Sequence, residues 1–254
     1  MNKGIFVALI ICFLIVTGGC SNGEKKDTTL TVSAASSLKD VLEEIGRLFQ
    51  KDYPHIEVRF NFGASGALKQ QIEQGAPVDL FFSASVDHFE ELEKSDFIHS
   101  GSNVVSNELV LITSKQADIE LDDFIDLSNK EIERIAIGTP SVVPAGTYAQ
   151  QALQYDHAWE DIQTKIVYAK DVRQVLTYVE TENVQAGIVY KTDALSSERV
   201  KVIAIADAIS HEPITYPIGI LRSSKSIEEA KIFSEYLKRD EIKELWQQFG
   251  FIQD

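Results

Sequence analysis

Four short segments of the chain lie where a strand pattern gives way to a helix pattern, and three of them consist mainly of small or hydroxyl-bearing residues. The four are residues 34–37 (AASS), 63–66 (GASG), 144–147 (PAGT) and 170–173 (KDVR). The first turn of a helix has backbone N–H groups without partners and carries the positive end of the peptide dipoles. Small residues let an anion approach that backbone, and the hydroxyls of Ser37 and Ser65 add donors. These segments could therefore bind an anion through neutral donors.

The combined dipoles and donors of these segments suit a doubly charged guest. Each helix terminus carries roughly +0.5 charge, so converging termini from all these segments would supply about +2. Hydrogen bonds to a charged group contribute roughly 1.5–3 kcal/mol each, so about seven donors are needed to offset desolvation of the anion. The segments together with Tyr190 can supply such a set without a Lys or Arg. Each segment alone has the features of an ordinary helix cap, and the sequence does not show that they converge.

The elements that must position these segments alternate between strand and helix along nearly the whole chain. Apolar residues recur at helical spacing after Ser36, with Ser36 or Ser37 placed to cap that helix, and they alternate at strand spacing over 55–62. This order predicts an α/β fold in which each sheet is mostly parallel and flanked by helices. Such sheets bind ligands beyond the carboxyl ends of their strands, at helix N-termini.

Two apolar strands are expected to carry the chain between two lobes. Residues 108–114 and 214–221 read as strands without polar loop clusters beside them. We therefore predict a first lobe made of 28–108 plus 214–254 and a second lobe made of 109–213. The ligand is expected in the cleft between them.

The first residues have the pattern of a targeting segment rather than of a folded element. A basic tip is followed by an apolar run of about a dozen residues, too short for a bilayer-spanning helix of roughly 20, and then by small residues before Cys20. We predict a signal peptide over 1–19 and a polar tether over 20–27. Cleavage removes Cys12 and leaves Cys20 as the one cysteine of the mature chain, so no disulfide can form within it.

Composition excludes several classes of function. The net charge is −15, which disfavours binding to nucleic acid and repels anions at long range. The five histidines lie without a second His or Cys at metal-ligand spacing, so no free cation site is predicted. No nucleophile is paired with a base, so we do not expect an enzyme or a cofactor. Arg173 is a candidate anion clamp, although an ion pair that stabilises the helix start is favoured for it.

The chain resembles the molybdate-binding periplasmic protein family of type II substrate-binding proteins. The stretches that carry the resemblance are residues 31–38 (TVSAASSL), 75–81 (GAPVDLF), 143–149 (VPAGTYA), 171–173 (DVR), 187–190 (GIVY) and 249–251 (FGF). They follow one another in the family order across about residues 28 to 254. The family's first motif often has Ala where Ser36 stands here, and some relatives have a run of serines where Ser65 lies between Ala64 and Gly66. Neither change removes a donor from the predicted set.

The resemblance implies a ligand set and a cellular role. The ligand is molybdate, with tungstate as a second guest, and molybdenum is held as an oxyanion rather than as a free cation. Ser37 and Ser65 would bind oxygen through hydroxyl and backbone N–H, Ala145 and Val172 through backbone N–H, and Tyr190 through its phenol hydroxyl. Cys20 would carry the lipid of a bacterial lipoprotein, which anchors a monomeric extracytoplasmic protein to the cell membrane. The partners implied are an ABC permease and its ATPase.

A site built only of donors suits a fully deprotonated oxyanion, because such an anion offers only acceptors. Monohydrogen phosphate brings a proton that would meet a donor, whereas sulfate is excluded only by pocket size. Sulfate binding and anion sensing by a lipoprotein therefore stay open as alternatives.

Overall fold

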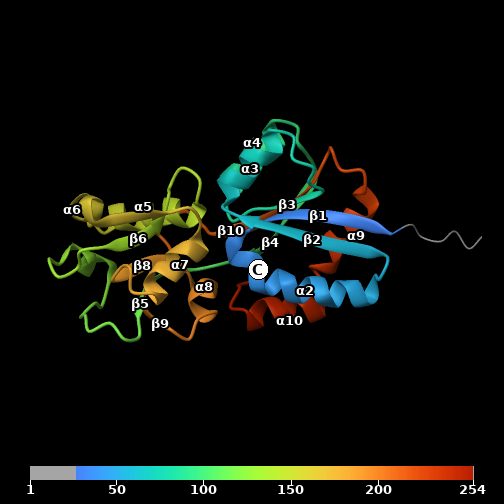
Figure 1. The fold of residues 1–254 in the computed structure, drawn as a ribbon. Helices are drawn as coiled ribbons and strands as arrows, with labels where there is room; N and C mark the ends of the chain where they lie inside the picture. Colours follow the sequence, from blue (N-terminus) through green and yellow to red (C-terminus); the bar gives the residue numbers. More distant parts are fainter. Residues whose placement is uncertain (1–26, 254) are drawn as a thin grey trace, which may run out of the picture.

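The computed structural model describes residues 27–253, so the predicted signal peptide over 1–19 and the predicted lipid on Cys20 lie outside the described residues. None of the helices within 27–253 is both long and apolar enough to cross a membrane. The described chain folds into two lobes, each built on a five-stranded sheet (Figure 1). The predicted two-lobed α/β fold is thereby confirmed.

The first sheet, which defines lobe I, has the strand order β2-β1-β3-β10-β4. Its strands are β1 (Thr28–Ala35), β2 (Ile56–Gly63), β3 (Leu80–Phe82), β4 (Ile98–Ser106) and β10 (Thr215–Leu221). The second sheet, which defines lobe II, has the order β7-β6-β8-β5-β9. Its strands are β5 (Leu109–Ser114), β6 (Ile135–Gly138), β7 (Ile166–Ala169), β8 (Ala186–Tyr190) and β9 (Val200–Ile205).

Helices cover both sheets. In lobe I they are the 3-10 turn η1 (Ser36–Leu38), α2 (Lys39–Asp52), α3 (Ser65–Glu73), α4 (Val86–Lys94), α9 (Ile227–Tyr236) and α10 (Asp240–Gln248). In lobe II they are η2 (Phe124–Ser128), α5 (Pro144–Tyr155), α6 (Trp159–Ile162), η3 (Gln163–Lys165), α7 (Val172–Glu180) and α8 (Lys191–Leu195).

Both sheets are mixed rather than mostly parallel as expected. In lobe I, β1 pairs in parallel with β2 and β3, whereas β10 pairs antiparallel with β3 and β4. In lobe II, β6 pairs in parallel with β7 and β8, whereas β5 pairs antiparallel with β8 and β9. The reason is the same in each lobe: β5 and β10 arrive from the other lobe and run against the strands that they join.

The chain crosses between the sheets twice. It passes from β4 to β5 through Asn107 and Glu108, and from β9 to β10 through residues 206–214. All strands of the first sheet lie within the predicted first lobe, and all strands of the second sheet lie within the predicted second lobe. The exact lobe boundaries stay a prediction. Strand β4 was not expected, because its sequence IHSGSNVVS has few apolar residues.

Successive side chains of β3 pack into two hydrophobic clusters, one on each face of the lobe I sheet. Phe82 faces α2 and α10, where it packs against Trp246. Phe81 faces the other side, where it joins α3 and α4 and stacks on Phe89. Because successive strand residues point to opposite faces, one short apolar strand holds helices on both sides of the sheet. The sheet is thus a rigid platform for the helix starts at its carboxyl edge.

Candidate oxyanion site

The four predicted segments each join the carboxyl end of a strand to the start of a helix. η1 follows β1 directly, α3 follows β2, α5 follows β6 after a short loop, and α7 follows β7. β1 and β2 are parallel neighbours, and so are β6 and β7. Because parallel neighbours end at the same edge of a sheet, each lobe presents two helix starts at one edge.

These two edges meet across the cleft and enclose one small cavity. Ser37, Ser65, Ala145, Val172 and Tyr190, the five residues singled out from the sequence, all line it. Its other lining residues are Ala35, Ser36, Gly63, Ala64, Ala84, Val143 and Pro144. None of the described residues that line the cavity is charged, so the local field there comes from backbone and hydroxyl dipoles. That the five bind an anion stays a prediction.

The helix starts at the cavity leave backbone donors uncapped. α3 and α5 begin without a side-chain cap, and Pro144 takes the first position of α5, where its missing N–H costs nothing. Asp171 caps α7 by accepting from the N–H of Gln174, at 2.8 Å, which leaves the N–H of Val172 uninvolved in that cap. The suggestion that Ser36 or Ser37 caps the first helix is wrong. Ala35 takes the capping position, and no side chain caps that turn.

Three buried hydroxyls surround the cavity. The Ser65 oxygen accepts from the N–H of Ala84 at 2.9 Å, and the Ser37 oxygen lies 3.0 Å from the Tyr216 hydroxyl. The Tyr190 hydroxyl is buried and has no hydrogen-bond partner in the described chain. Burial raises the pKa of Tyr190 well above its usual range, so the phenol keeps its proton. A buried donor without a partner is costly, and an anion in the cavity would remove that cost.

The two lobes touch at the rim of the cavity. The N–H of Gly66 in lobe I donates to the carbonyl of Val142 in lobe II at 3.0 Å. The Arg173 guanidinium of α7 reaches the Asp40 carboxylate of α2 at 2.7 Å. Both contacts require the lobes to lie against each other, so the structure is the closed arrangement.

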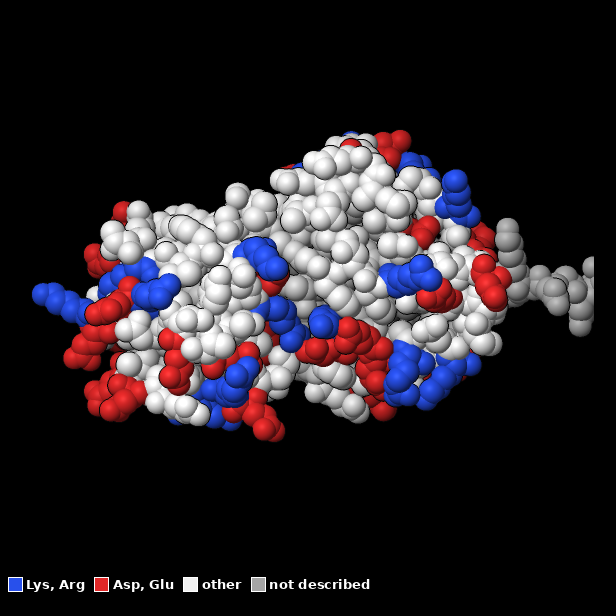
Figure 2. Space-filling view, in the orientation of Figure 1, with Lys and Arg blue, Asp and Glu red and all other residues white. Residues whose placement is uncertain are grey.

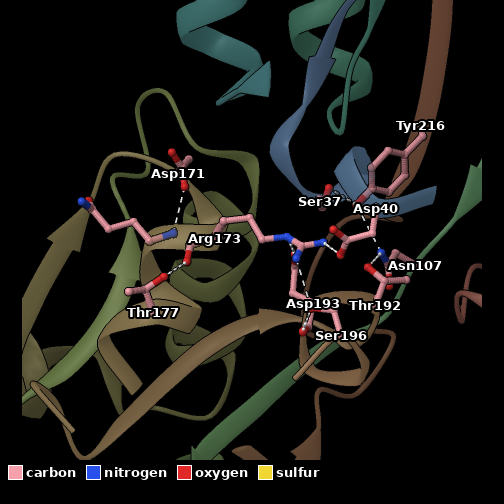
Figure 3. A network of polar contacts seen from close by, with 11 residues as sticks. Ser37, Asp40, Asn107, Asp171, Arg173, Thr177, Thr192, Asp193, Ser196 and Tyr216 are labelled. Carbon is pink, nitrogen blue, oxygen red and sulfur yellow. Dashed lines mark hydrogen bonds and ion pairs between the residues drawn. The ribbon is translucent and has the colours of Figure 1, made fainter. Parts of the chain in front are cut away.

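Arg173 is an ion-pairing residue rather than a clamp in the cavity (Figure 3). Besides Asp40, it lies against the fully buried carboxylate of Asp193, with Nε and Oδ1 2.8 Å apart. That contact is an ion pair without the alignment of a hydrogen bond, and neither atom has another partner. Burial raises the pKa of Asp193 to about 6, against the opposing attraction of Arg173. The favoured reading of Arg173 from the sequence therefore agrees with its contacts.

Sequence reasoning missed three residues of the site. Ala84 lies directly after β3 and supplies the N–H that bonds Ser65. Tyr216 and Asn107 lie at the two chain crossings and form a buried hydrogen-bond chain to Ser37. Ala84 has no chemical signal in its type. Asn107, directly before one predicted crossing strand, and Tyr216, within the other, gave only a weak signal as polar residues.

A larger groove lies elsewhere on lobe I, with a volume of about 620 Å³. It is lined by Asp79 and Asp96 as well as by Arg222 and Lys225. Carboxylates repel an anion, and no residue of lobe II contributes to this groove. No cluster of three or more metal-ligating side chains occurs within 27–253 either. The small cavity between the lobes is therefore the better candidate site.

Figure 2 shows how the charged side chains are distributed over one face of the molecule. There, Lys, Arg, Asp and Glu gather toward the lower part and the ends, and a broad uncharged area crosses the upper middle. The residues that line the cavity are uncharged, which is consistent with a site that works through local dipoles.

A two-lobed α/β fold with a ligand cavity between the lobes defines the class of periplasmic-type binding proteins. The chain belongs to the bacterial extracellular solute-binding protein family, whose model matches residues 30–252. It is 47% identical over 253 residues to YvgL of Bacillus subtilis, provisionally named as a substrate-binding lipoprotein of an ABC transporter, with 97% of this chain and 96% of that protein covered. It is 34% identical to the molybdate-binding protein ModA of Haemophilus influenzae, covering 87% of this chain and 89% of ModA.

The fold is also similar to a solved structure from Clostridium difficile. That structure is the substrate-binding domain of a provisionally named molybdenum ABC transporter, with a TM-score of 0.69 and 35% sequence identity. The likeness covers 89% of this chain and 99% of that domain. The names of these relatives describe binding proteins, two of them belonging to ABC transporters.

Proposed function

We propose that this protein captures molybdate, and tungstate in the same site, outside the cytoplasm and delivers it to an ABC importer. The observation that carries the proposal is the lining of the inter-lobe cavity. Ser37 and Ser65 from lobe I face Ala145, Val172 and Tyr190 from lobe II across an uncharged cavity. The names of the relatives support molybdate as the guest.

The proposed roles follow from the donors that each residue has. Ser37 and Ser65 each offer a hydroxyl and a backbone N–H, Ala145 and Val172 each offer a backbone N–H, and Tyr190 offers its phenol. Hydrogen bonds to an ionised acceptor contribute roughly 1.5–3 kcal/mol each, and in a buried site they are not weakened by water. The unpartnered Tyr190 hydroxyl is the clearest sign of a missing acceptor.

The selectivity that we propose has two parts. Neutral donors alone favour anions without protons, which disfavours monohydrogen phosphate. Sulfate passes that filter and has to be rejected by size. A sulfate-binding role is therefore the alternative that a titration must separate from a molybdate-binding role.

The proposed cellular arrangement is that of a lipoprotein. We infer that cleavage leaves Cys20 as the first residue, that its lipid anchors the protein to the cell membrane, and that a monomer presents the anion to a permease driven by its ATPase. A Cys20→Ser variant should be released from the membrane fraction into the soluble fraction. A variant that stays in the membrane fraction would count against the lipid anchor without touching the ligand site.

Isothermal titration calorimetry of the purified protein with molybdate, tungstate, sulfate and phosphate tests the proposal. We expect tight one-to-one binding of molybdate and tungstate, weaker binding of sulfate and the weakest, though measurable, binding of phosphate. Ser37→Ala should weaken molybdate binding by roughly 1–3 kcal/mol. Ser95→Ala, at an exposed position of lobe I outside the cavity, is the matched control. Equal affinity for sulfate and molybdate would favour the alternative role.

A further inference from the structure

A buried chain of hydrogen bonds behind Ser37 has a direction that the neighbouring groups determine. It begins at Asn107, in the crossing from β4 to β5, whose Oδ1 accepts from the N–H of Glu108 at 2.9 Å. That contact identifies the other side-chain atom as the amide nitrogen, which carries two protons. One proton is directed at Thr192 Oγ1, 2.9 Å away, and the other at the Tyr216 hydroxyl oxygen, 3.2 Å away (Figure 3).

The Tyr216 hydroxyl must then donate to Ser37. It has one proton, and its oxygen already accepts from Asn107. Its remaining neighbour is the Ser37 oxygen, at 3.0 Å. Both side chains are buried, and burial raises the pKa of Tyr216 far above its usual range, so the proton is always present. The reverse direction would leave two donors, Asn107 and Ser37, on one hydroxyl and the Tyr216 proton without an acceptor.

Ser37 is consequently left with its own proton to give. Its oxygen accepts from Tyr216, and the side chain borders the cavity, so the proton is free to point at a guest. Ser65 is set in the same way, because its oxygen accepts from the backbone N–H of Ala84. The Ala84 N–H can only donate, so it always holds the Ser65 hydroxyl as a donor toward the cavity. The direction of the Ser37 hydroxyl depends on the side chains of Asn107 and Tyr216, which can be substituted.

We propose that Asn107 and Tyr216 are specificity-determining positioning residues that hold the Ser37 hydroxyl as a donor toward the cavity. The inference rests on the proposed function and deepens it. It assigns the rejection of protonated oxyanions to a relay behind the cavity, namely the hydrogen-bond chain that runs from Asn107 through Tyr216 to Ser37. While Ser37 is held as a donor, the proton of monohydrogen phosphate meets another proton there. A relay of opposite direction would give that proton an acceptor.

Asn107→Asp should reverse the relay. A carboxylate has no proton, so it would accept from Tyr216, whose oxygen would then accept from Ser37 and turn the lone pairs of Ser37 toward the cavity. The added charge repels molybdate and monohydrogen phosphate alike, since both are dianions, and the ratio of their affinities therefore isolates the direction of the hydroxyl. We expect molybdate to bind at least about 10-fold more weakly, and the molybdate-to-phosphate affinity ratio to fall by about 10-fold or more.

Two further variants keep the test decisive. Asn103→Asp makes the same substitution at an exposed position of β4, and it should leave the affinity ratio unchanged. Tyr216→Phe removes the relay without adding charge. It frees Ser37 to rotate, so the ratio should fall by less than in Asn107→Asp. Circular dichroism and thermal unfolding would establish that each variant is folded before calorimetry at a pH where monohydrogen phosphate is the main species.

The outcomes separate this inference from the proposed function. A wild-type protein that binds no molybdate overturns the proposed function and, with it, the inference. A wild-type protein that binds molybdate and rejects phosphate, together with folded Asn107→Asp or Tyr216→Phe variants whose affinity ratios equal the wild-type value, overturns the inference alone. A fall in the ratio for Asn107→Asp but not for Asn103→Asp supports it.

Discussion

The guanidinium of Arg173 at the start of α7 lies 2.7 Å from the carboxylate of Asp40 on α2, and this ion pair joins the two lobes. Arg173 is also held by Asp193 of its own lobe, so it is positioned before the lobes meet. The pair is partly exposed, with 23% and 37% of the side chains accessible, and such pairs contribute modestly. Its place at the junction makes it a contribution to closure rather than to the fold of either lobe.

Replacing Asp40 should therefore loosen the closed form. We expect Asp40→Asn to weaken molybdate binding by roughly 2- to 5-fold, because closure and binding are coupled. Added salt should shrink this difference. Calorimetry at low and high ionic strength provides the measurement, and Glu43→Gln, at an exposed site on the same helix, is the matched control. An affinity equal to that of the wild type at low salt would show that the pair does not assist closure.

Gly66 is the second closure residue that we expect to be sensitive. A Cβ at this position would lie 2.8 Å from both the Cα and the carbonyl oxygen of Val142, across the lobe junction. Gly66→Ala should hold the lobes apart and cost roughly 1–3 kcal/mol of ligand affinity, while lobe I itself stays folded. Small-angle scattering with and without molybdate would report the closure directly.

The matched control for that substitution is Gln70→Ala, at an exposed position of the same helix, α3. It should leave both the affinity and the ligand-induced compaction unchanged. A Gly66→Ala protein that compacts on molybdate as fully as the wild type would contradict the steric interpretation.

Tyr190→Phe should separate ligand binding from stability. The hydroxyl has no partner in the described chain, so its removal breaks no hydrogen bond and the unfolding temperature of the free protein should not fall. Molybdate affinity should drop roughly 10- to 100-fold, because a donor to the anion is lost. Differential scanning calorimetry with and without molybdate measures both. Tyr178→Phe on α7 removes a hydroxyl outside the cavity and should change neither quantity.

The buried carboxylate of Asp193 should make stability depend on pH. Its pKa rises from 3.8 to about 6 on folding, so the folded protein holds a proton that the unfolded chain releases. The contribution to stability is present below pH 3.8 and is lost as the pH rises through about 6. Asp193→Asn cannot ionise, so its free energy of unfolding relative to the wild type should increase across that window by up to roughly 3 kcal/mol.

Urea unfolding at several pH values inside and above that window would measure this difference. Replacing the carboxyl by an amide also changes contacts that do not depend on pH, so the slope rather than the absolute difference is diagnostic. Asp161→Asn, at an exposed position of α6, should run parallel to the wild type. Parallel curves for Asp193→Asn as well would mean that Asp193 is ionised in both states throughout.

Much of the fold followed from local patterns. The alternation of strand and helix and the helix starts within 144–147 and 170–173 depend on a few neighbouring residues, and the structure contains them. Strand β4 escaped detection because only Ile98 and Val105 are buried in it, and its pairing partner β10 is more than a hundred residues away in the chain. The antiparallel crossings depend on how the lobes exchange strands, which no local pattern records.

The candidate site, like the fold, could be predicted from local patterns only in part. Each helix start could be read from small residues after a strand, but their convergence depends on sheet order and lobe closure. The spacing of residues could not show that the helix starts converge on one ligand, and the resemblance to the molybdate-binding family supplied that prediction. The contact between Asn107 and Tyr216 spans 109 positions of sequence and involves residue types common in any protein, so nothing local distinguished it.

The uncharged lining of the cavity has a kinetic consequence. An anion approaching this acidic molecule meets repulsion from a distance and attraction only once it is inside the cleft, where water no longer screens the dipoles. Dissolved salt should then accelerate arrival of the guest and leave its departure nearly untouched. Capture would be favoured in saline surroundings, opposite to the behaviour of sites that attract their anions with lysine and arginine.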